Sequence, residues 1–437
     1  MRFFALAALS GATLAACLIV ACSSDPEGGR GATDPTEGGA TSDGPNNSET
    51  SIDPVDGGRD AAKKDGDTET DGAVVDDGGK IDGGDPPGVQ LIGRFEANGA
   101  NFDFAYPGSK LIARFNGTDA TVKLTQTDGF STGHSWFNVI VDGVAQPKIE
   151  VNGPSVVYPV AVNLAAGAHV VELEKRTESI FGVVRYEGFT FPNGGVLLGP
   201  PARKTRRIEV LTDSTIDGFG VEGNLDPAAP LNWCGPATMA NNYGAPANFS
   251  NSRKSMPVLT ATALNAETFL IGYSGKGLTK NNAPGDPLTF PMLYERTLPD
   301  VAGSAHGFGL QADAVVISLG GVDLDGLSVA PGGFATAYGG LVDKVRARYP
   351  GAWIFMTVWA QIKNNGPTTR TAMKTALQAV ADARAADTKL SIFEFPESSG
   401  GVNGGLDESG CQFHANEGLH ASRAPLLTAE IKAKLGW

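Results

Sequence analysis

Two hydrophobic periodicities follow one another in this chain of 437 residues, and each restricts the fold of the segment that carries it. Between residues 89 and 202, apolar residues alternate with polar ones in short segments, separated by turn signals such as Asn116-Gly117 and Asp142-Gly143. Alternation of period two in regularly spaced short segments predicts an antiparallel β-sandwich. The clearest predicted strands are Leu111–Phe115, Ala120–Leu124, Phe137–Asp142, Val170–Glu174 and Val184–Phe189.

From residue 203 to residue 437 the pattern changes to buried strands that alternate with amphipathic helices. Such alternation predicts a parallel sheet with helices on both faces. The predicted strands are Ala312–Gly321, Ala352–Val358 and Leu390–Phe395, and the predicted helices are Phe334–Tyr349, Thr369–Ala386 and Ala424–Leu435.

The chain begins with Met1-Arg2 and an apolar run that is too short to span a membrane, which predicts a secretory signal over residues 1–21. The end of this run, Ile19-Val20-Ala21-Cys22, resembles a bacterial lipobox, so Cys22 is the predicted lipidation site. Cys17 fits the same pattern, and simple secretion with cleavage nearby is the alternative. We expect an exported protein that is lipid-anchored at the outer membrane or cell surface.

Residues 22–88 are rich in Gly and Asp and contain almost no large apolar side chains, so we predict a disordered acidic tether. Residues 23–88 carry 17 acidic and 5 basic side chains, a net charge of −12 out of −14 for the whole chain. The acidity therefore belongs to the tether and gives no information about the substrate. It argues against nucleic acid as a partner, and the lipid anchor is the only predicted contact with a membrane.

Two cysteines remain after the signal leaves with Cys17 and Cys22 takes the lipid. These are Cys234 and Cys411. In an exported protein, such a pair favours a disulfide over a metal site or a reactive thiol.

The apolar stretch Ile208–Leu211 stops abruptly at Thr212-Asp213-Ser214, and a glycine-punctuated segment follows it. This pattern predicts a buried parallel strand with a serine on the turn at its carboxyl end. Ligands bind at the carboxyl ends of strands in open α/β sheets, and a serine there becomes a nucleophile when a base reaches it. The alternative is that Ser214 caps a following helix.

Four segments in chain order resemble the four sequence blocks of the SGNH (GDSL-like) hydrolases: Thr212–Ser214, Tyr273–Leu278, Leu319–Asp323 and Gly410–His414. The chain is most similar to carbohydrate esterase family 2, the acetyl xylan esterase-like group. Members of that family carry a jelly-roll domain before the hydrolase domain and often end in Leu-Gly-Trp, as Leu435-Gly436-Trp437 does here. Further similar segments are Lys175–Glu178, Pro200-Pro201, Arg206–Glu209 and Met292–Leu298.

The resemblance covers about residues 89–437. It implies an all-β jelly-roll sandwich over 89–202, followed over 203–437 by an SGNH hydrolase domain with a flavodoxin-like three-layer α/β/α fold. It implies no metal and no organic cofactor.

The resemblance also assigns roles to residues. Ser214 occupies the position of the nucleophile and His414 that of the general base, because a serine hydroxyl needs a base within hydrogen-bond reach. The backbone N–H groups of Ser214 and Gly275 match the oxyanion hole. In members without a triad acid, a backbone carbonyl orients the histidine, and Phe413 is the corresponding neighbour. His420 is the alternative base, although packing or capping suits it better.

The chain departs from the family pattern at four positions. Thr212 replaces the glycine before Asp-Ser, and Ala415 replaces the proline after the histidine. Gln412 replaces the aspartate that orients the histidine. Val322 replaces the asparagine whose side chain donates to the oxyanion, so one donor of the oxyanion hole is missing.

Other polar residues receive structural interpretations. We expect Asp213 and Asp323 to be turn and cap residues. A Cys234–Cys411 bond would tie the loop after Ser214 to the loop that carries His414. No role is assigned to His306. Three residues of the first domain are expected to be packing or surface residues, and contacts with a sugar are the alternative. The three are His134, Trp136 and His169.

These features predict a surface-anchored serine esterase that removes acetyl or similar small acyl groups from a carbohydrate or polysaccharide. The alternative is a catalytically decayed esterase scaffold that binds carbohydrate or acts in cell-surface interactions. Retention of Ser214 and His414 favours the first hypothesis, and Val322 favours the second.

Overall fold

The computed structural model describes residues 85–127, 133–223, 234, 244–325, 327–362, 367–398 and 408–437. All of these residues belong to one compact unit. The predicted signal, Cys22 and nearly all of the predicted tether lie outside the described residues. None of the helices in the described part of the chain is long and apolar enough to cross a membrane.

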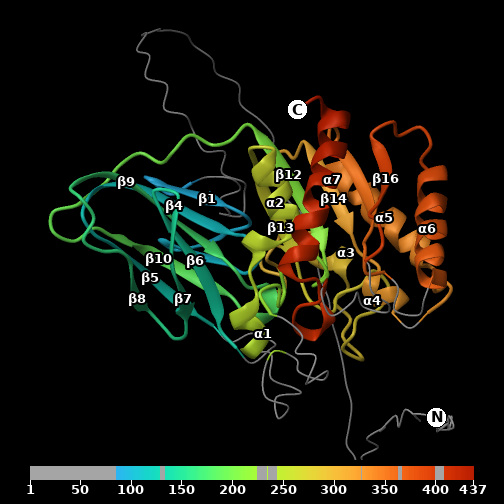
Figure 1. The fold of residues 1–437 in the computed structure, drawn as a ribbon, viewed down its shortest axis with the longest axis horizontal. Helices are drawn as coiled ribbons and strands as arrows, with labels where there is room; N and C mark the ends of the chain where they lie inside the picture. The colour runs from blue at the N-terminus through green and yellow to red at the C-terminus, as the bar shows by residue number, and fades with distance from the viewer. Residues whose placement is uncertain are drawn as a thin grey trace, which may run out of the picture. The chain divides into compact units, whose positions relative to one another are not determined.

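The first folded part is an antiparallel β-sandwich, as the alternating pattern predicts (Figure 1). Its large aromatic side chains, Phe104, Phe115 and Phe137, are fully buried between the sheets. The turn at Asp142-Gly143 joins two neighbouring strands with φ angles of 50° and 79°, the left-handed conformation that two-residue hairpins require. One sheet contains, in order, β1 (Val89–Ile92), β4 (Lys110–Gly117), β9 (Gly167–Lys175), β6 (Ser135–Val141) and β7 (Val144–Val151), with β11 (Val196–Leu197) on β4. The other contains β2 (Glu96–Asn98), β3 (Asn101–Phe104), β10 (Val184–Thr190), β5 (Ala120–Gln126) and β8 (Val156–Ala161).

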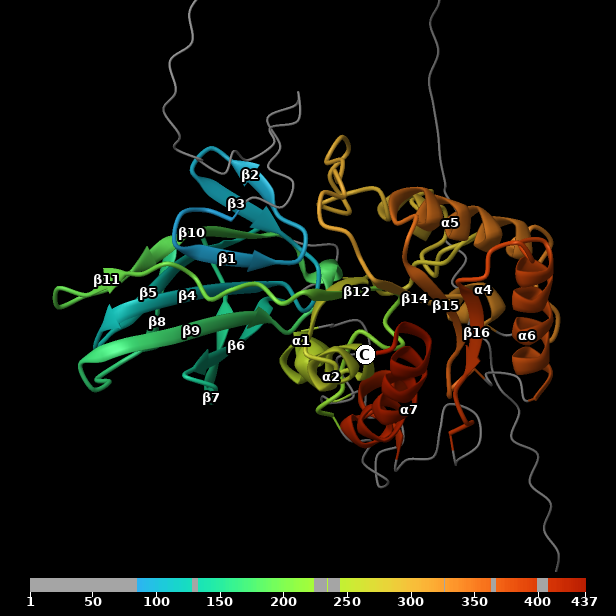
Figure 2. The ribbon, with the colours of Figure 1, turned by 90° about the horizontal axis from the view of Figure 1, so that it is seen from above.

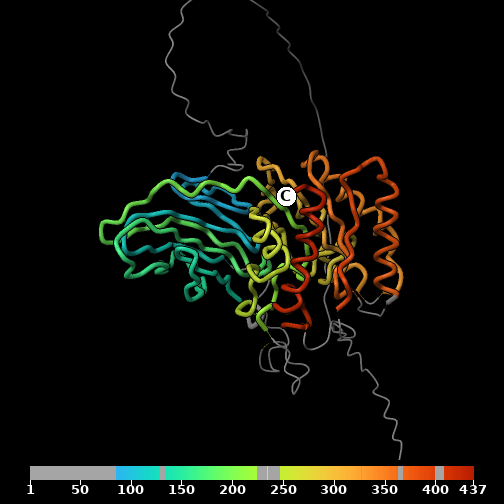
Figure 3. Tube along the Cα trace, turned by 45° about the horizontal axis from the view of Figure 1, so that its top comes forward, coloured from blue at the N-terminus to red at the C-terminus, as the bar shows by residue number. Residues whose placement is uncertain are grey.

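The second folded part is built on a five-stranded parallel sheet, which the chain enters through residues 198–205 after β11 (Figure 3). The strand order is β13-β12-β14-β15-β16, the order of flavodoxin-like folds, and it places the first strand of the sheet in an interior position. The strands are β12 (Arg206–Thr212), β13 (Ala266–Gly272), β14 (Ala314–Ser318), β15 (Trp353–Val358) and β16 (Leu390–Glu394).

Helices cover both faces of the parallel sheet, which confirms the predicted three-layer arrangement (Figure 2). Neighbouring residues of one strand point to opposite faces: Leu211 packs into the core under α5 and α6, and Val210 packs into the core under α2 and α7. These helices are α5 (Phe334–Arg348), α6 (Pro367–Asp382), α2 (Met256–Ala263) and α7 (Glu417–Leu435). Shorter ones are α1 (Gly244–Phe249), α3 (Phe290–Leu293), α4 (Gly321–Leu324) and the 3₁₀ turns η1 (Ser179–Phe181), η3 (Ser252–Lys254) and η5 (Cys411–Phe413).

A buried ion pair joins the sandwich to the parallel sheet. Arg94, which follows β1, lies with its Nη2 atom 2.6 Å from Oε1 of Glu209 in β12, and both side chains are almost fully inaccessible. The Arg94 guanidinium also lies 5.2 Å from the centre of the Tyr294 ring and 5.0 Å from that of Phe308. The two parts of the chain therefore share a desolvated polar contact in addition to apolar packing.

Candidate active site

Ser214 follows the carboxyl end of β12 and lies on a turn that Asp213 stabilises. The buried Asp213 carboxylate accepts hydrogen bonds from the backbone N–H of Thr215, at 2.9 Å, and from its hydroxyl, at 2.6 Å. Asp213 is thus a turn residue, as expected. Residues 214–222 form turns and no helix begins after Ser214 within them, so the N-cap alternative for this serine is wrong.

His414 lies against Ser214 although 200 residues separate the two in the sequence. Its Nε2 atom is 2.7 Å from the Ser214 Oγ atom, which is hydrogen-bond distance. A neutral imidazole at this distance can accept the hydroxyl proton as the serine oxygen attacks a carbonyl carbon. Within the described residues, the fold thus brings together the two side chains that the sequence marked as nucleophile and base.

The backbone carbonyl that faces His414 Nδ1 is that of Cys411, whereas the sequence pointed to Phe413. His414 Nδ1 lies 3.3 Å from the carbonyl oxygen of Cys411. The carbonyl oxygen of Phe413 instead accepts a hydrogen bond from Gln361 Nε2 at 3.2 Å. The reason is local: Gln412 and Phe413 have φ angles of 52° and 60°, so the chain reverses and the carbonyl three residues back faces the ring.

The surroundings of His414 keep its ring neutral. Burial lowers the pKa of the imidazole to about 4, although the backbone carbonyls of Cys411 and Gln412 act in the opposite direction. The Phe219 ring, whose centre is 4.6 Å from that of His414, supplies part of the apolar environment. At neutral pH the ring is therefore available to accept a proton.

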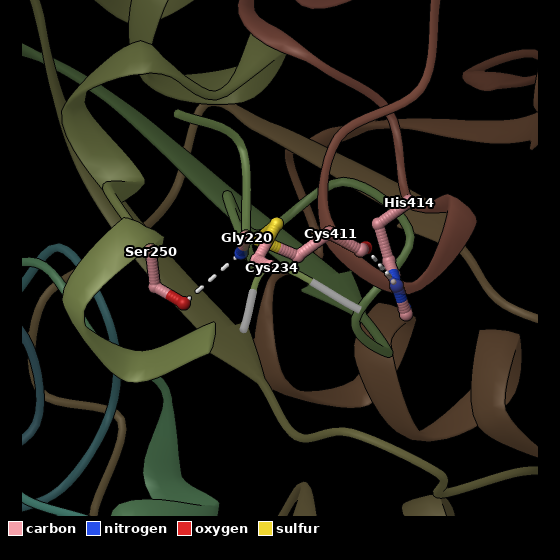
Figure 4. The surroundings of a disulfide bond; sticks show 5 residues. All are labelled: Gly220, Cys234, Ser250, Cys411 and His414. Carbon is pink, nitrogen blue, oxygen red and sulfur yellow. Dashed lines mark hydrogen bonds between the residues drawn. A yellow bond between two sulfur atoms is a disulfide. The ribbon is translucent and has the colours of Figure 1, made fainter. Parts of the chain in front are cut away.

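A disulfide joins Cys234 to Cys411, the residue whose carbonyl faces the His414 ring (Figure 4). The loop that follows Ser214 packs tightly against this bond. A Cβ atom added to Gly223 would lie 2.2 Å from Cys234 Sγ and 2.3 Å from Cys411 Sγ, so only glycine fits there. The bond thus holds the loop after the serine and the turn before the histidine together.

The second and third sequence blocks approach the same point. Gly275 follows β13 in a left-handed conformation, with a φ angle of 71°, and lines the same cavity as Ser214 and His414. Gly321, at the start of α4, is so close to the nucleophile turn that a Cβ atom on it would lie 3.3 Å from Asp213 Oδ2. Val322, the next residue, is buried.

Asp323 links the third block to the second, because its carboxylate accepts hydrogen bonds from the backbone N–H groups of Leu278, at 2.8 Å, and Thr279, at 2.7 Å. Asp323 thus holds the loop after the second block and does not cap a helix. Val322 therefore lies in a segment that contacts both the nucleophile turn, through Gly321, and the Gly275 loop, through Asp323.

The cavity at Ser214 has a volume of about 510 Å³ and two kinds of lining. Apolar side chains come from Ile180, Phe219 and Leu288. The sequence reasoning assigned no substrate-binding role to the polar lining, although part of it lies in the second block and the polar loop after that block was an available signal. The polar lining consists of Tyr273, Ser274, Lys276, Asn282, Asp286, Asp300 and Gln412.

Comparisons with known proteins connect this geometry to a family. The model of the carbohydrate esterase 2 N-terminal domain matches residues 91–201. The solved structure of a family two carbohydrate esterase from Clostridium thermocellum, in complex with cellohexaose, matches 80% of this chain and 100% of that chain, with 32% sequence identity and a TM-score of 0.69. The chain belongs to carbohydrate esterase family 2.

Two relatives with curated names support this membership. The cellulase/esterase CelE of Acetivibrio thermocellus is 36% identical over 361 residues, which is 81% of this chain but only 40% of CelE. An acetylxylan esterase / glucomannan deacetylase of Cellvibrio japonicus is 25% identical over 358 residues, which is 80% of this chain and 90% of that protein. The predicted carbohydrate esterase family 2 fold, an antiparallel sandwich before a parallel α/β part, is confirmed.

His420, the alternative base in the carbohydrate esterase family 2 comparison, has a structural role instead. Its Nδ1 atom accepts a hydrogen bond from the backbone N–H of Met256 at 3.1 Å, at the start of α2, and its ring stacks on Trp359. Burial lowers the pKa of this imidazole to about 3. The ring therefore remains neutral and acts as a helix cap.

Three residues of the sandwich, for which sugar contacts were the alternative, do not line the cavity: His134, Trp136 and His169. His134 and His169 lie on the sandwich and contact Glu150 and Asp142, at 2.7 and 2.6 Å. Trp136 packs beneath the Lys148 ammonium. Among the residues that the structure describes, no cluster of three or more His, Cys, Asp or Glu side chains is arranged to hold a metal ion.

Proposed function

We propose that this protein is a serine esterase that removes acetyl or similar small acyl groups from a carbohydrate. The observation that carries the proposal is the 2.7 Å contact between Ser214 Oγ and His414 Nε2 at the carboxyl end of β12. The names of the relatives, which include acetylxylan esterase and glucomannan deacetylase, support an acylated polysaccharide as the substrate class.

In the proposed reaction, Ser214 Oγ attacks the ester carbonyl carbon while His414 Nε2 takes the hydroxyl proton. The backbone N–H groups of Ser214 and Gly275 donate to the oxyanion of the tetrahedral intermediate. When that intermediate collapses, the carbon–oxygen bond to the sugar breaks and His414 returns the proton to the sugar oxygen. Water then attacks the acyl-serine, again with His414 as the base, and releases the carboxylic acid and the free serine.

The proposed enzyme is slow because Val322 has no side-chain donor where the family has an asparagine. Loss of one oxyanion donor costs on the order of 10²–10³ in turnover. The same residue favours the second candidate function, a decayed scaffold that binds carbohydrate without hydrolysing it. The two candidates differ in whether any Ser214-dependent hydrolysis occurs.

We also propose that the protein is exported and held at the outer membrane or cell surface by a lipid on Cys22. The motivation is the lipobox-like sequence that ends at Cys22, followed by the acidic segment of residues 23–88. Metabolic labelling with a fatty acid tests this, because Cys22→Ser should abolish incorporation. If Cys17→Ser abolishes incorporation and Cys22→Ser does not, the wrong cysteine was chosen.

The decisive experiment measures acetate release from an aryl acetate and from acetylated xylan by the exported, oxidised protein. Ser214→Ala and His414→Ala should each abolish release while thermal unfolding stays close to that of the wild type. His420→Ala is the matched control: it should lower the melting temperature, since it removes the cap of α2, but keep the activity of the folded protein. Equal rates for wild type and Ser214→Ala would disprove the esterase proposal.

A further inference from the structure

A short segment of the β-sandwich reaches the active-site cavity. Directly after β9, residues 176–181 leave the sandwich and lie against the loop that follows β13. Ile180 lines the cavity together with Ser214, and the hydroxyl of Ser179 donates a hydrogen bond to the carbonyl oxygen of Gly272 at 3.2 Å. The first folded part therefore contributes to the surroundings of the site.

Glu178 makes the closest polar contact between this segment and the site. One oxygen of its carboxylate accepts a hydrogen bond from the backbone N–H of Ser274, and the other accepts one from the Ser274 hydroxyl. Ser274 directly precedes Gly275, and both line the cavity. These two contacts fix the Ser274 Cα atom, and the backbone N–H of Asn282 donates to the carbonyl oxygen of Gly275 at 2.9 Å, so the planar Ser274–Gly275 peptide is anchored on both sides and the direction of the Gly275 N–H is restricted.

Burying a carboxylate at position 178 costs folding free energy. Glu178 is 1% exposed, and burial raises the pKa of its carboxyl to about 7. Buried Asp217 and Asp213 lie close enough to oppose its charge. The one nearby cation, among the residues that act on this carboxyl, is fully buried Lys175, whose Nζ donates to the backbone carbonyl of Glu178 at 3.0 Å. An apolar side chain would fill a purely packing position at lower cost.

We propose that Glu178 is a positioning residue that holds the Ser274–Gly275 peptide so that the Gly275 N–H points to the oxyanion. In this arrangement the β-sandwich completes the oxyanion hole of the α/β part. The inference rests on the proposed esterase function, because its readout is ester hydrolysis. The direction of the backbone donors matters more in this protein than in family members with an asparagine, because Val322 supplies no side-chain donor to the oxyanion.

The test compares kcat and KM for an aryl acetate in Glu178→Ala, Glu178→Gln and Ser274→Ala. Oxyanion donors act mainly in the transition state, so Glu178→Ala should lower kcat by about 10- to 100-fold with KM nearly unchanged. Glu178→Gln should recover most of the loss, because its amide oxygen accepts from the Ser274 N–H and its NH₂ donates to the hydroxyl. Ser274→Ala, which keeps the backbone contact, should lower kcat by less than Glu178→Ala.

Glu174 provides the matched control. It is also buried, lies four residues earlier, and contacts the α/β part through Arg253, whose Nη1 atom is 2.8 Å from Glu174 Oε2, but it does not line the cavity. Glu174→Ala should lower the melting temperature and leave kcat unchanged. If Glu174→Ala lowers kcat as much as Glu178→Ala does, the effect is a general loss of interface packing and the inference is wrong.

The outcomes separate this inference from the proposed function. A wild-type protein without Ser214-dependent hydrolysis overturns both. An active wild type whose kcat is unchanged in folded Glu178→Ala overturns the positioning role alone. If Glu178→Ala does not fold, Ser274→Ala decides the question, because it removes the hydroxyl contact and keeps the backbone contact: a fall in kcat at constant KM supports the inference, and an unchanged kcat overturns it.

Discussion

Val322→Asn is the substitution that tests the oxyanion hole most directly. Val322 is buried at the second residue of α4, between Gly321, which contacts the nucleophile turn, and Asp323, which holds the loop after Gly275. Val322 itself does not line the cavity, but the residues on either side of it contact the loops that carry the proposed backbone donors. We expect an amide at this position to supply the side-chain donor that family members carry there.

The expected gain follows from two opposing effects. One added oxyanion donor contributes up to about 2.7–4 kcal/mol in the transition state, or 10²–10³ in turnover. The amide replaces a buried aliphatic group and costs roughly 1–3 kcal/mol of folding stability where its polar atoms stay unpaired. Incomplete positioning of the amide lowers the catalytic gain further. We therefore predict an increase in kcat of at least about tenfold, or about 1.4 kcal/mol, with KM nearly unchanged and a lower melting temperature.

The assay is steady-state hydrolysis of an aryl acetate, with Val322→Ala as the control that removes the aliphatic group without adding a donor. An unchanged kcat in folded Val322→Asn would refute the argument that a side-chain donor is missing. Asn282, whose side chain lines the same cavity, is then the first candidate for a donor that is already present, and Asn282→Ala should lower kcat. Activity that appears in Val322→Asn from none in the wild type would favour the decayed scaffold.

Three further outcomes follow from the site. Because the folded protein lowers the pKa of His414 to about 4, the acid limb of the kcat/KM profile should lie below the pKa of about 6.5 of a free histidine, since hydrolysis requires the neutral ring. His414 and His420 are both held neutral, so their contribution to the free energy of unfolding should decline as the pH falls from about 6.5 toward 4, whereas Glu178 and Asp213, whose pKa values the fold raises to about 7 and about 6, contribute in the opposite direction; urea titrations at several pH values should therefore show a smaller loss of stability on acidification in His420→Gln than in the wild type. Cys234→Ser should lower the free energy of unfolding by about 5 kcal/mol, because the disulfide closes a loop with a sequence separation of 177 residues, and it should lower kcat more than it lowers the helix signal in circular dichroism; unchanged kcat in folded Cys234→Ser would contradict a role in orienting His414.

The parts of the fold that depend on hydrophobic period were predictable from the sequence. Alternation marked five of the sandwich strands, and the β/α alternation marked the central strands and helices of the parallel sheet. The start of α7 was predicted at Ala424 but lies at Glu417. Gly418 and His420 weaken the helical pattern of its first turns, and the decisive signal is the side chain of Asn416, which accepts from the backbone N–H of Leu419 at 3.0 Å.

In the candidate site, block order was enough to identify the two side chains that the fold brings into contact. The carbonyl that faces His414 was not predictable, because it depends on two consecutive left-handed residues that are not glycine, Gln412 and Phe413. Glu178 was noted only as part of a family-like segment. Its contact with Ser274 joins residues 96 apart across two folded parts, and no local pattern encodes such a contact.

The Arg94–Glu209 ion pair has a consequence for how this protein can be divided. The predicted boundary near residue 202 separates two hydrophobic patterns that lie within one compact unit. A chain that begins after this boundary would leave Glu209, in the strand that leads to Ser214, without its partner Arg94, and losing one partner of a pair that stays buried costs about 3–5 kcal/mol. Transfer of the α/β part to another protein therefore requires that the sandwich be transferred with it, or that Glu209 be replaced by a residue that does not need Arg94.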